Sequence, residues 1–172
     1  MEKARILNVA SATYLFICGI VSLYYLIIVL VQNDIVSFLT WFSFFCSIAV
    51  VLTTIFNNYK ILSSLSKINK TSIILNLFIC IPQVINISIN GFQFKFNQGF
   101  EFIFYTNLEN VTKKVNLGLY FLNINYLLNI KFLESNYSIV GINLINLFLF
   151  LFYLSQYRKM TIVNKMESTH LD

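Results

Sequence analysis

The chain has 172 residues, of which 58% are hydrophobic, 17% aromatic and only 11% charged, and its mean hydropathy is +0.73. Soluble domains carry about 25% charged residues. The composition excludes an ordinary soluble enzyme, because so few charges do not cover the surface of a globule. The high apolar content excludes intrinsic disorder, and the length predicts one domain. A small integral membrane protein is the class that remains.

The spacing of charged residues predicts how often the chain crosses the membrane. A helix needs about 20 apolar residues to cross about 30 Å of hydrocarbon, and one charge at mid-bilayer costs roughly 2.5–3.5 kcal/mol. Four longer stretches lack Asp, Glu, Lys and Arg, namely 6–33, 35–59, 71–94 and 135–157. We therefore expect a single domain over residues 1–172, an all-α membrane protein whose bundle of four transmembrane helices covers 6–31, 36–57, 71–89 and 138–157.

The third of these spans is the least regular. Its second half contains Pro82, Gln83 and Asn86, and proline removes a helical hydrogen bond and kinks the chain. Isoleucines alternate with polar residues over 85–89, a period of two that favours a strand. The helix is therefore expected to bend or stop in this region.

The basic residues predict the orientation, because cytoplasmic loops are enriched in Lys and Arg. The side that carries both termini and the 58–70 loop holds Lys3, Arg5, Lys60, Lys67, Lys70, Arg158, Lys159 and Lys165. The opposite side holds Lys95, Lys113, Lys114 and Lys131, mixed with acidic residues. Both termini, with a tail over 158–172, are therefore expected in the cytoplasm, and the protein in a plasma or inner membrane.

Residues 90–135 are expected outside the cytoplasm as a small β-hairpin or sheet between the third and fourth spans. Phenylalanines alternate with other residues on both sides of Asn97-Gln98-Gly99, and a three-residue loop that ends in Gly is typical of a hairpin. In this register Lys95 lies opposite Glu101. Six rings share one face and form a candidate partner surface: Phe92, Phe94, Phe96, Phe100, Phe102 and Phe104.

Three alternatives are open for this phenylalanine face. It packs on a second pair of strands at 115–121 and 123–133, or its rings dip into the outer leaflet, where aromatic residues are enriched. The third alternative is a partner-binding surface, since large exposed apolar patches mark interaction sites.

The chain lacks the usual groups of catalysis and of metal binding. Its one histidine, His170, lies near the C-terminus, and its three cysteines lie within apolar stretches. No span contains an ionisable Asp, Glu, Lys, Arg or His, so haem, zinc and proton-relay sites have no support. We expect no enzyme, no catalytic residue, no cofactor and no metal. The scattered basic residues also give no case for nucleic acid.

Polar residues within the spans form two further candidate sites. Thr40, Ser43, Ser47 and Thr54 lie on one stripe of the second span, and small hydroxyl residues let membrane helices pack closely. Asn143 and Asn146 share one face of the fourth span, where Gln83 or Asn86 is the expected partner. Both sets are candidates for helix packing or for the lining of a pore.

These observations favour a non-enzymatic membrane protein that binds a partner in or at the bilayer. Immunity proteins, accessory subunits and membrane sensors act in this way, and the expected partner is a membrane protein or a peptide. A homo-oligomeric channel or membrane-permeabilising effector is the alternative, with self-association in place of a partner. An enzyme acting on lipid is the weakest hypothesis, because acid and base groups are missing.

Overall fold

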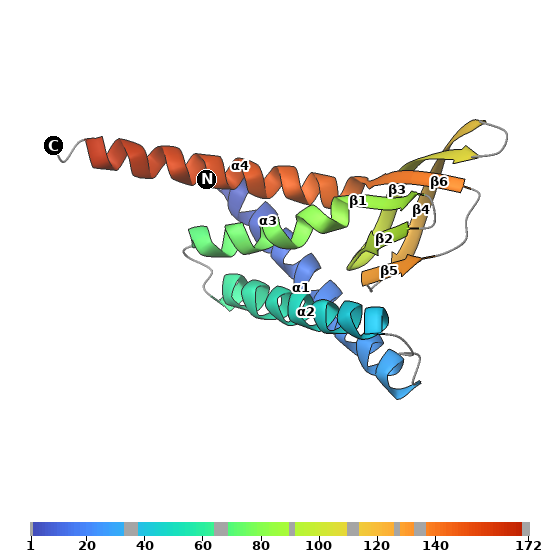
Figure 1. Cartoon of the computed structure of the whole chain (residues 1–172). Coiled ribbons are helices and arrows are strands. Elements are labelled where there is room, and N and C mark those ends of the chain that lie inside the picture. The colour runs from blue at the N-terminus through green and yellow to red at the C-terminus, as the bar shows by residue number, and fades with distance from the viewer. Residues whose placement is uncertain are drawn as a thin grey trace.

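The structure is a computed structural model that describes residues 2–32, 38–63, 69–89, 92–109, 114–125, 128–132 and 137–169. Within these ranges the chain forms four helices, α1 (Glu2–Val31), α2 (Phe38–Ser63), α3 (Lys70–Val84) and α4 (Leu144–Thr169). It also forms six strands, β1 (Ile85–Ile89), β2 (Phe92–Phe96), β3 (Gly99–Glu109), β4 (Val115–Asn125), β5 (Leu128–Phe132) and β6 (Tyr137–Asn143). The helices lie together, and the sheet lies at the end where α3 stops and α4 begins (Figure 1).

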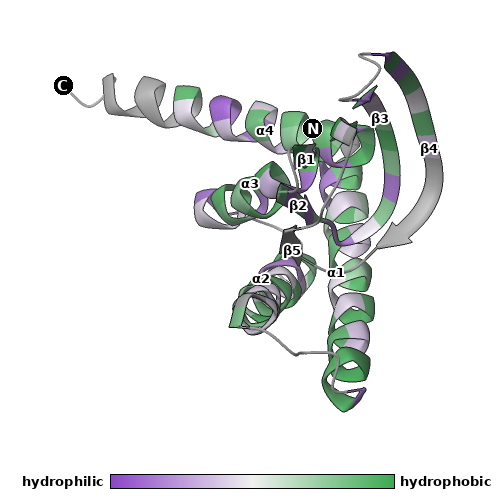
Figure 2. Cartoon of the chain, turned by 45° about the vertical axis from the view of Figure 1, so that its right-hand side comes forward, coloured by the Kyte–Doolittle hydropathy of each residue, from purple (hydrophilic) through white to green (hydrophobic). Residues whose placement is uncertain are grey.

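The helices pack as two pairs, α1 with α2 and α3 with α4. One core cluster joins α1, α3 and α4 through Leu15, Ile73 and Tyr153, and the Tyr153 hydroxyl donates a 3.0 Å hydrogen bond to Ser11 of α1. A second cluster joins α1 and α2. Apolar residues cover most sides of α1 and α2, as Figure 2 shows, so each helix still exposes apolar side chains after packing.

The predicted bundle of four transmembrane helices is wrong. By length and composition, two helices are able to cross a membrane, over Arg5–Val31 and Thr40–Ser63. The other two charge-free stretches are each divided between a helix and a strand: α3 runs directly into β1, and β6 runs directly into α4. With 15 residues, α3 is about 22 Å long, too short for the hydrocarbon layer. At the other end, α4 continues through the predicted tail to Thr169.

The division of these stretches has a local cause. Asn69 caps the start of α3 by accepting a hydrogen bond from the Thr71 amide at 3.2 Å. Pro82 lies in the last turn of α3 and deprives it of one hydrogen bond. The β-branched isoleucines of 85–89 then favour a strand. A lack of charge indicates that a stretch is apolar, but it does not distinguish a helix from a strand.

The six strands form one antiparallel sheet in the order β4-β3-β6-β1-β2-β5. The register of β2 with β5 continues into that of β3 with β4: Phe96 pairs with Leu128, and Gly99 pairs with Asn125. Residues 92–109 and 115–132 are therefore the two arms of one long hairpin, which bends between β2 and β3. Strands β1 and β6 pair with each other and fill the angle of this bend, so the sheet curls around one face.

Gly99 is the first residue of β3, and the backbone conformation at this position requires glycine. Its φ of 116° is a conformation that other residues rarely adopt. A Cβ here would also lie 2.6 Å from Cys18 Sγ and 2.8 Å from Tyr14 Oη, both on α1. The bend is therefore pressed against α1, and the Phe100 amide donates a 3.3 Å hydrogen bond to the Tyr14 hydroxyl.

The predicted hairpin over Phe92–Phe104 is wrong, although both of its strands exist. β2 pairs with β1 and β5, and β3 pairs with β4 and β6, so the two strands are not neighbours. β2 instead forms a hairpin with β1, in which Ile89 pairs with Phe92. In the sequence, the dipeptide between these two strands is Asn-Gly, which is a strong hairpin signal.

The predicted second pair of strands is also wrong in its pairing. β4 and β5 follow each other along one arm and do not pair together. The register of β3 with β4 shifts between Glu101 and Phe102. Asn123 pairs with Glu101 and Phe121 with Phe102, which leaves Leu122 as the extra residue of a β-bulge.

Candidate binding site

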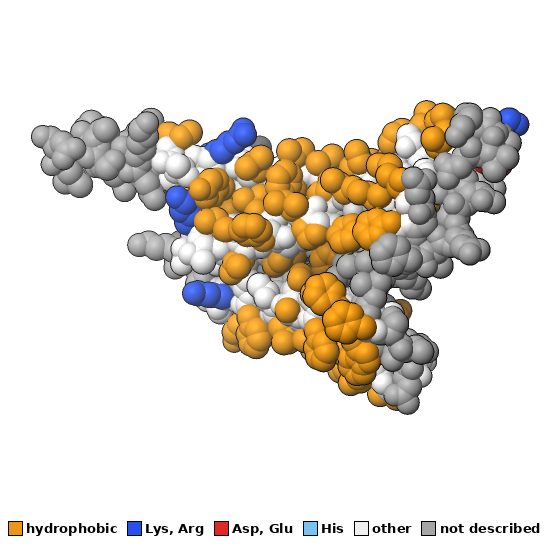
Figure 3. Space-filling view, in the orientation of Figure 1, with side chains coloured by type: hydrophobic (Ala, Val, Ile, Leu, Met, Phe, Trp, Pro, Cys, Tyr) orange, Lys and Arg blue, Asp and Glu red, His pale blue; other side chains and the backbone are white. Residues whose placement is uncertain are grey.

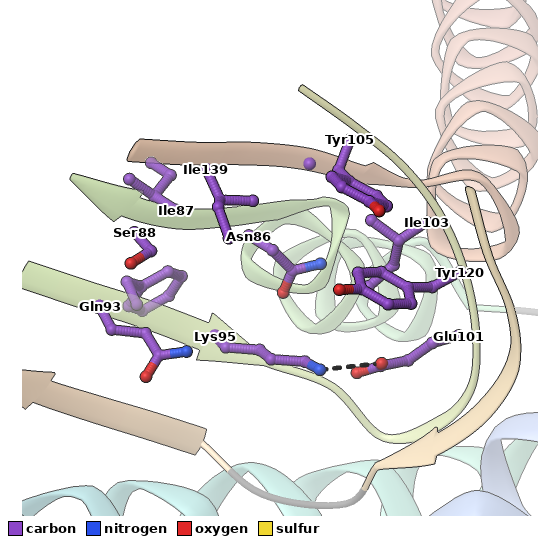
Figure 4. Close-up of a pocket in the computed structure, with 12 residues that line it drawn as sticks. Asn86, Ile87, Ser88, Gln93, Lys95, Glu101, Ile103, Tyr105, Tyr120 and Ile139 are labelled. Carbon is purple, nitrogen blue, oxygen red and sulfur yellow. Dashed lines mark hydrogen bonds and ion pairs between the residues drawn. The ribbon is translucent and has the colours of Figure 1, made fainter. Parts of the chain in front are cut away.

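The inner face of the curled sheet borders a half-open cavity of about 340 Å³ (Figure 4). Its apolar lining comes from Ile87, Phe94, Ile103, Ile139 and Gly141. Its polar lining comes from four strands and consists of Asn86, Ser88, Gln93, Lys95, Glu101, Tyr105 and Tyr120. The volume lies at the lower end of the range that is typical of small-molecule sites.

Strand alternation explains why polar groups point inward. In β1, Asn86 is buried beside the cavity, whereas Ile85 and Ile89 are exposed on the opposite, outer face. A row of paired residues crosses the outer face through β4, β3, β6 and β1, and all four are exposed and apolar: Leu119, Phe104, Ile142 and Ile85. Polar residues inside and apolar residues outside are the pattern of sheets that face lipid.

Glycines on the inner face let neighbouring side chains pack closely on the sheet beside Asn86. Asn86 pairs with Gly141, Gly141 pairs with Tyr105, and Tyr105 pairs with Gly118. A Cβ on Gly141 would lie 2.7 Å from the Ile103 side chain, and one on Gly118 would overlap the Tyr105 ring. The Ile103 side chain and the Tyr105 ring therefore lie directly over positions that hold no side chain, which fixes them as walls of the cavity beside Asn86.

Lys95 and Glu101 form an ion pair within the cavity, with 2.9 Å between Nζ and Oε2. Glu101 is 1% exposed and Lys95 is 21% exposed. The predicted pairing of these two residues is confirmed, but it forms across the bend and not between neighbouring strands. A buried charge of either sign is costly without its partner, so the pair holds the cavity near electrical neutrality.

Three polar atoms beside this ion pair lack a hydrogen-bond partner. They are both side-chain atoms of Asn86, Nδ2 and Oδ1, and the second carboxylate oxygen of Glu101, Oε1. Asn86 is 9% exposed. Each such buried atom costs roughly 1–3 kcal/mol, and Figure 4 shows the Asn86 amide pointing into the space between Tyr120 and the ion pair. Unpartnered donors and acceptors of this kind mark a place for water or a ligand.

Two tyrosines form one wall of the cavity. The rings of Tyr105 and Tyr120 stack with 4.5 Å between centroids and 18° between planes. Loss of solvation raises the pKa of Tyr105, and the neighbouring Tyr120 adds to the shift. Tyr105 therefore stays a neutral phenol, and the stacked pair offers a flat aromatic surface next to the Asn86 amide.

A second group of buried polar residues surrounds the bend, and we name it the bend cluster: Thr54, Gln83, Asn97, Gln98, Asn143 and Asn146. Asn97 Oδ1 accepts hydrogen bonds from Asn143 Nδ2 at 3.1 Å and from Asn146 Nδ2 at 2.8 Å. The Gln98 amide donates to Gln83 Oε1 at 2.8 Å, and Gln98 Oε1 lies 3.1 Å from the Thr54 hydroxyl. This cluster ties α2, α3 and α4 to the sheet.

The bend cluster corrects the expected partner of two predicted site residues. The sequence predicts that Asn143 and Asn146 bond Gln83 or Asn86 within a helical bundle, but both side chains donate to Asn97 of the bend. Asn143 is the last residue of β6, so only Asn146 lies on a helix. Both are fully buried, which makes them packing residues within the single chain.

The stripe on α2 is likewise turned inward. Ser43, Ser47 and Thr54 are 6%, 1% and 0% exposed, and Thr40 is half-buried. Ser47 donates to the Ser43 carbonyl at 2.8 Å, within its own helix. In the single chain these residues serve helix packing.

The six phenylalanines of the candidate partner surface differ in burial. Phe92, Phe100 and Phe104 are exposed, Phe94 and Phe102 are half-buried, and Phe96 is 3% exposed. Because β2 and β3 lie on different sides of β6 and β1, the rings do not form one compact patch. The exposed ones join the apolar outer face of the sheet.

Sequence reasoning missed Asn86 as a site residue and missed a third polar cluster between α2 and α3. In that cluster, Asn57 Nδ2 donates to Asn76 Oδ1 at 2.8 Å, and Asn76 Nδ2 donates to Asn58 Oδ1 at 3.0 Å. The alternation of Asn86 and Ser88 with isoleucines was a usable signal for Asn86, and asparagine within apolar helix sequence was one for the α2–α3 cluster.

The lining of the cavity offers hydrogen-bond donors and acceptors from amide, hydroxyl and phenol groups. Neither histidine nor cysteine occurs among the described residues that line it, and its carboxylate is already paired with Lys95. Across the described part of the chain, no three His, Cys, Asp or Glu side chains gather where they would hold a metal ion. No protein-family model matches the sequence, and no curated protein or solved structure shows significant similarity to the chain.

Proposed function

We propose that the protein is a non-enzymatic membrane protein that acts by binding a partner, and that the sheet cavity receives a polar group of this partner. The observation that carries the proposal is the set of unpartnered atoms on Asn86 and Glu101, which face a cavity large enough for a ligand group. An immunity, accessory-subunit or sensor role is compatible with such a site, and a membrane protein or a peptide is the expected partner.

The bilayer is the second partner in this proposal. Exposed apolar side chains cover the helices and continue toward the sheet on the face that Figure 3 shows. Blue Lys and Arg side chains gather toward the end where α2 stops and α3 begins, and a further one lies at the far tip of the sheet. The basic residues of these helix segments include Lys60 in the last turn of α2, Lys70 at the start of α3, and Arg158 and Lys159 of α4. Such a cluster supports placing this end, with both termini, in the cytoplasm of a plasma or inner membrane.

Photo-crosslinking in the native membrane tests the binding function. A photoreactive residue at Gln93, which lines the cavity, is expected to give a discrete adduct that Asn86→Leu abolishes. The same residue at Val140, exposed on the outer face, is the matched control, and its adducts should not depend on Asn86. An adduct pattern at Gln93 that is unchanged by Asn86→Leu, or no adduct there at all, would contradict the proposal.

Quenching by brominated lipids tests the contact with the bilayer. Trp41 is the single tryptophan, so Trp41→Phe provides a background in which one tryptophan is placed at will. Phe104→Trp on the outer face is expected to be quenched strongly, and Tyr120→Trp beside the cavity weakly. Equal quenching at the two positions would contradict a lipid-facing outer sheet.

No specific observation favours the alternative of an oligomeric channel. A pore lined by Ser43, Ser47 and Thr54 would require these residues to leave the packed interior of the chain. A conductance measurement on the purified chain in planar bilayers is the direct check of that alternative.

A further inference from the structure

We infer that the sheet cavity recognises a neutral carboxamide or peptide group. This inference rests on the proposed binding function and names the chemistry that the site selects. It is carried by the kinds of unpartnered atoms and by the charge that is already present in the cavity.

The unpartnered atoms call for a ligand that both donates and accepts. Asn86 presents an unused donor, Nδ2, next to an unused acceptor, Oδ1. An amide group is the complement of another amide, because each offers an N–H and a C=O in one plane. Glu101 Oε1 supplies one further acceptor for a second N–H, so a primary carboxamide would satisfy all three atoms.

The charges of the cavity disfavour an ion. Lys95 and Glu101 neutralise each other at 2.9 Å, so an added ammonium or carboxylate would enter a buried site without an unpaired counter-charge. An ion in such a place loses its hydration without compensation. A neutral amide loses far less and regains hydrogen bonds.

The size and the walls of the cavity limit the rest of the ligand. About 340 Å³ holds a small molecule or one side chain of a partner, but not a folded segment. The stacked rings of Tyr105 and Tyr120 provide a flat wall on which a planar group stacks. A carboxamide attached to a ring, or to a peptide with an aromatic residue, therefore matches the cavity.

Three probes of equal size separate the chemistry of the polar group. Benzamide, benzoate and benzylammonium share one ring and differ in charge, and each is titrated into the full chain in detergent micelles with saturation-transfer NMR as the readout. We expect benzamide to bind at least tenfold more tightly than the two ions. Equal binding of all three, preference for an ion, or no binding would each overturn the inference, and no binding would mean a cavity filled by water.

Variants show whether binding occurs at Asn86. Asn86→Leu is expected to weaken benzamide at least tenfold, whereas Asn8→Leu should leave it unchanged. Asn8 is the matched control because it is a buried asparagine on α1 whose Oδ1 also lacks a partner. The isosteric Asn86→Asp adds a negative charge and should reverse the preference toward benzylammonium. Benzamide binding that persists in both Asn86 variants would overturn the inference.

A peptide probe identifies the source of the amide. Tighter binding of N-acetylphenylalaninamide than of benzamide points to a peptide segment, and weaker binding points to a small amide. The failure of this inference is distinguishable from the failure of the proposed function. If the cavity prefers an ion but crosslinking at Gln93 still occurs, the amide inference fails and the proposed binding function stands. If benzamide is preferred but no adduct forms at Gln93, the proposed macromolecular partner is rejected and the amide site stands.

Discussion

The bend cluster and the sheet cavity are two adjacent groups of buried polar side chains, and they differ in how their amides are bonded. Every side-chain amide of the bend cluster has at least one bonded atom, although Gln98 Nε2 and Asn146 Oδ1 lack a partner. At the bend, Asn97 Oδ1 accepts two hydrogen bonds and Asn97 Nδ2 donates to the Gly99 carbonyl at 3.0 Å. In the cavity, neither side-chain atom of Asn86 has a partner.

This difference separates a structural role from a binding role. Buried amides that bond to one another across several elements fix the path of the chain, since removing one leaves others unsatisfied. A buried amide without partners contributes nothing comparable to the fold and costs free energy. The second kind is retained at a site where another molecule completes the bonds. Substitutions in the two groups should therefore differ in their effects on stability.

The largest loss of stability is expected for Lys95→Met, which removes one half of the ion pair. Glu101, 1% exposed, would keep a buried charge without compensation. Breaking such a pair costs about 3–5 kcal/mol, measured as the free energy of unfolding in micelles. The double variant Lys95→Met/Glu101→Leu should recover most of this loss, and Lys159→Met, on an exposed part of α4, should have little effect. A loss that the double variant does not recover would assign the stability to the Lys95 stem and not to the charge.

A smaller loss is expected for Asn97→Leu at the bend. The substitution leaves Asn143 Nδ2 and Asn146 Nδ2 buried without their acceptor, which costs about 3 kcal/mol for the two groups together. The unfolding midpoint in denaturant measures this change. A cost below about 1 kcal/mol would indicate that the bend cluster does not hold the sheet to α4.

The smallest effect is expected for Asn86→Leu in the cavity. The Asn86 side chain has no hydrogen bond to lose. The penalty of its unpartnered amide disappears, so the free energy of unfolding should change by less than about 1 kcal/mol or rise. Thermal unfolding of the two asparagine variants side by side gives the comparison directly. If Asn86→Leu destabilises the chain as much as Asn97→Leu, Asn86 is bonded within the fold and the contrast between the two groups fails.

The amino-acid sequence by itself determined the apolar character of the chain and several local features. The charge-free stretches of α1 and α2 became helices long and apolar enough to cross a membrane. The alternating segments 92–96 and 100–104 form strands, as predicted, and Lys95 forms an ion pair with Glu101. These features depend on the composition and periodicity of one segment, which are visible in the sequence.

Only the tertiary structure decided which segments pair. The stretch 135–157 does not contain β1 or β3, the two strands that pair with β6, and the stretch 71–94 does not contain β6, the second neighbour of β1. Likewise, the sequence predicts Gln83 or Asn86 as the partner of Asn143. The actual partner is Asn97, which the bend in the long hairpin brings close to Asn143. The cavity has the same origin, because Asn86, Lys95 and Glu101 come together only when the sheet curls. Strand pairing and hydrogen bonding between buried polar groups each depend on two segments that are distant in the sequence. The residue pattern of one segment does not identify the segment that it will contact.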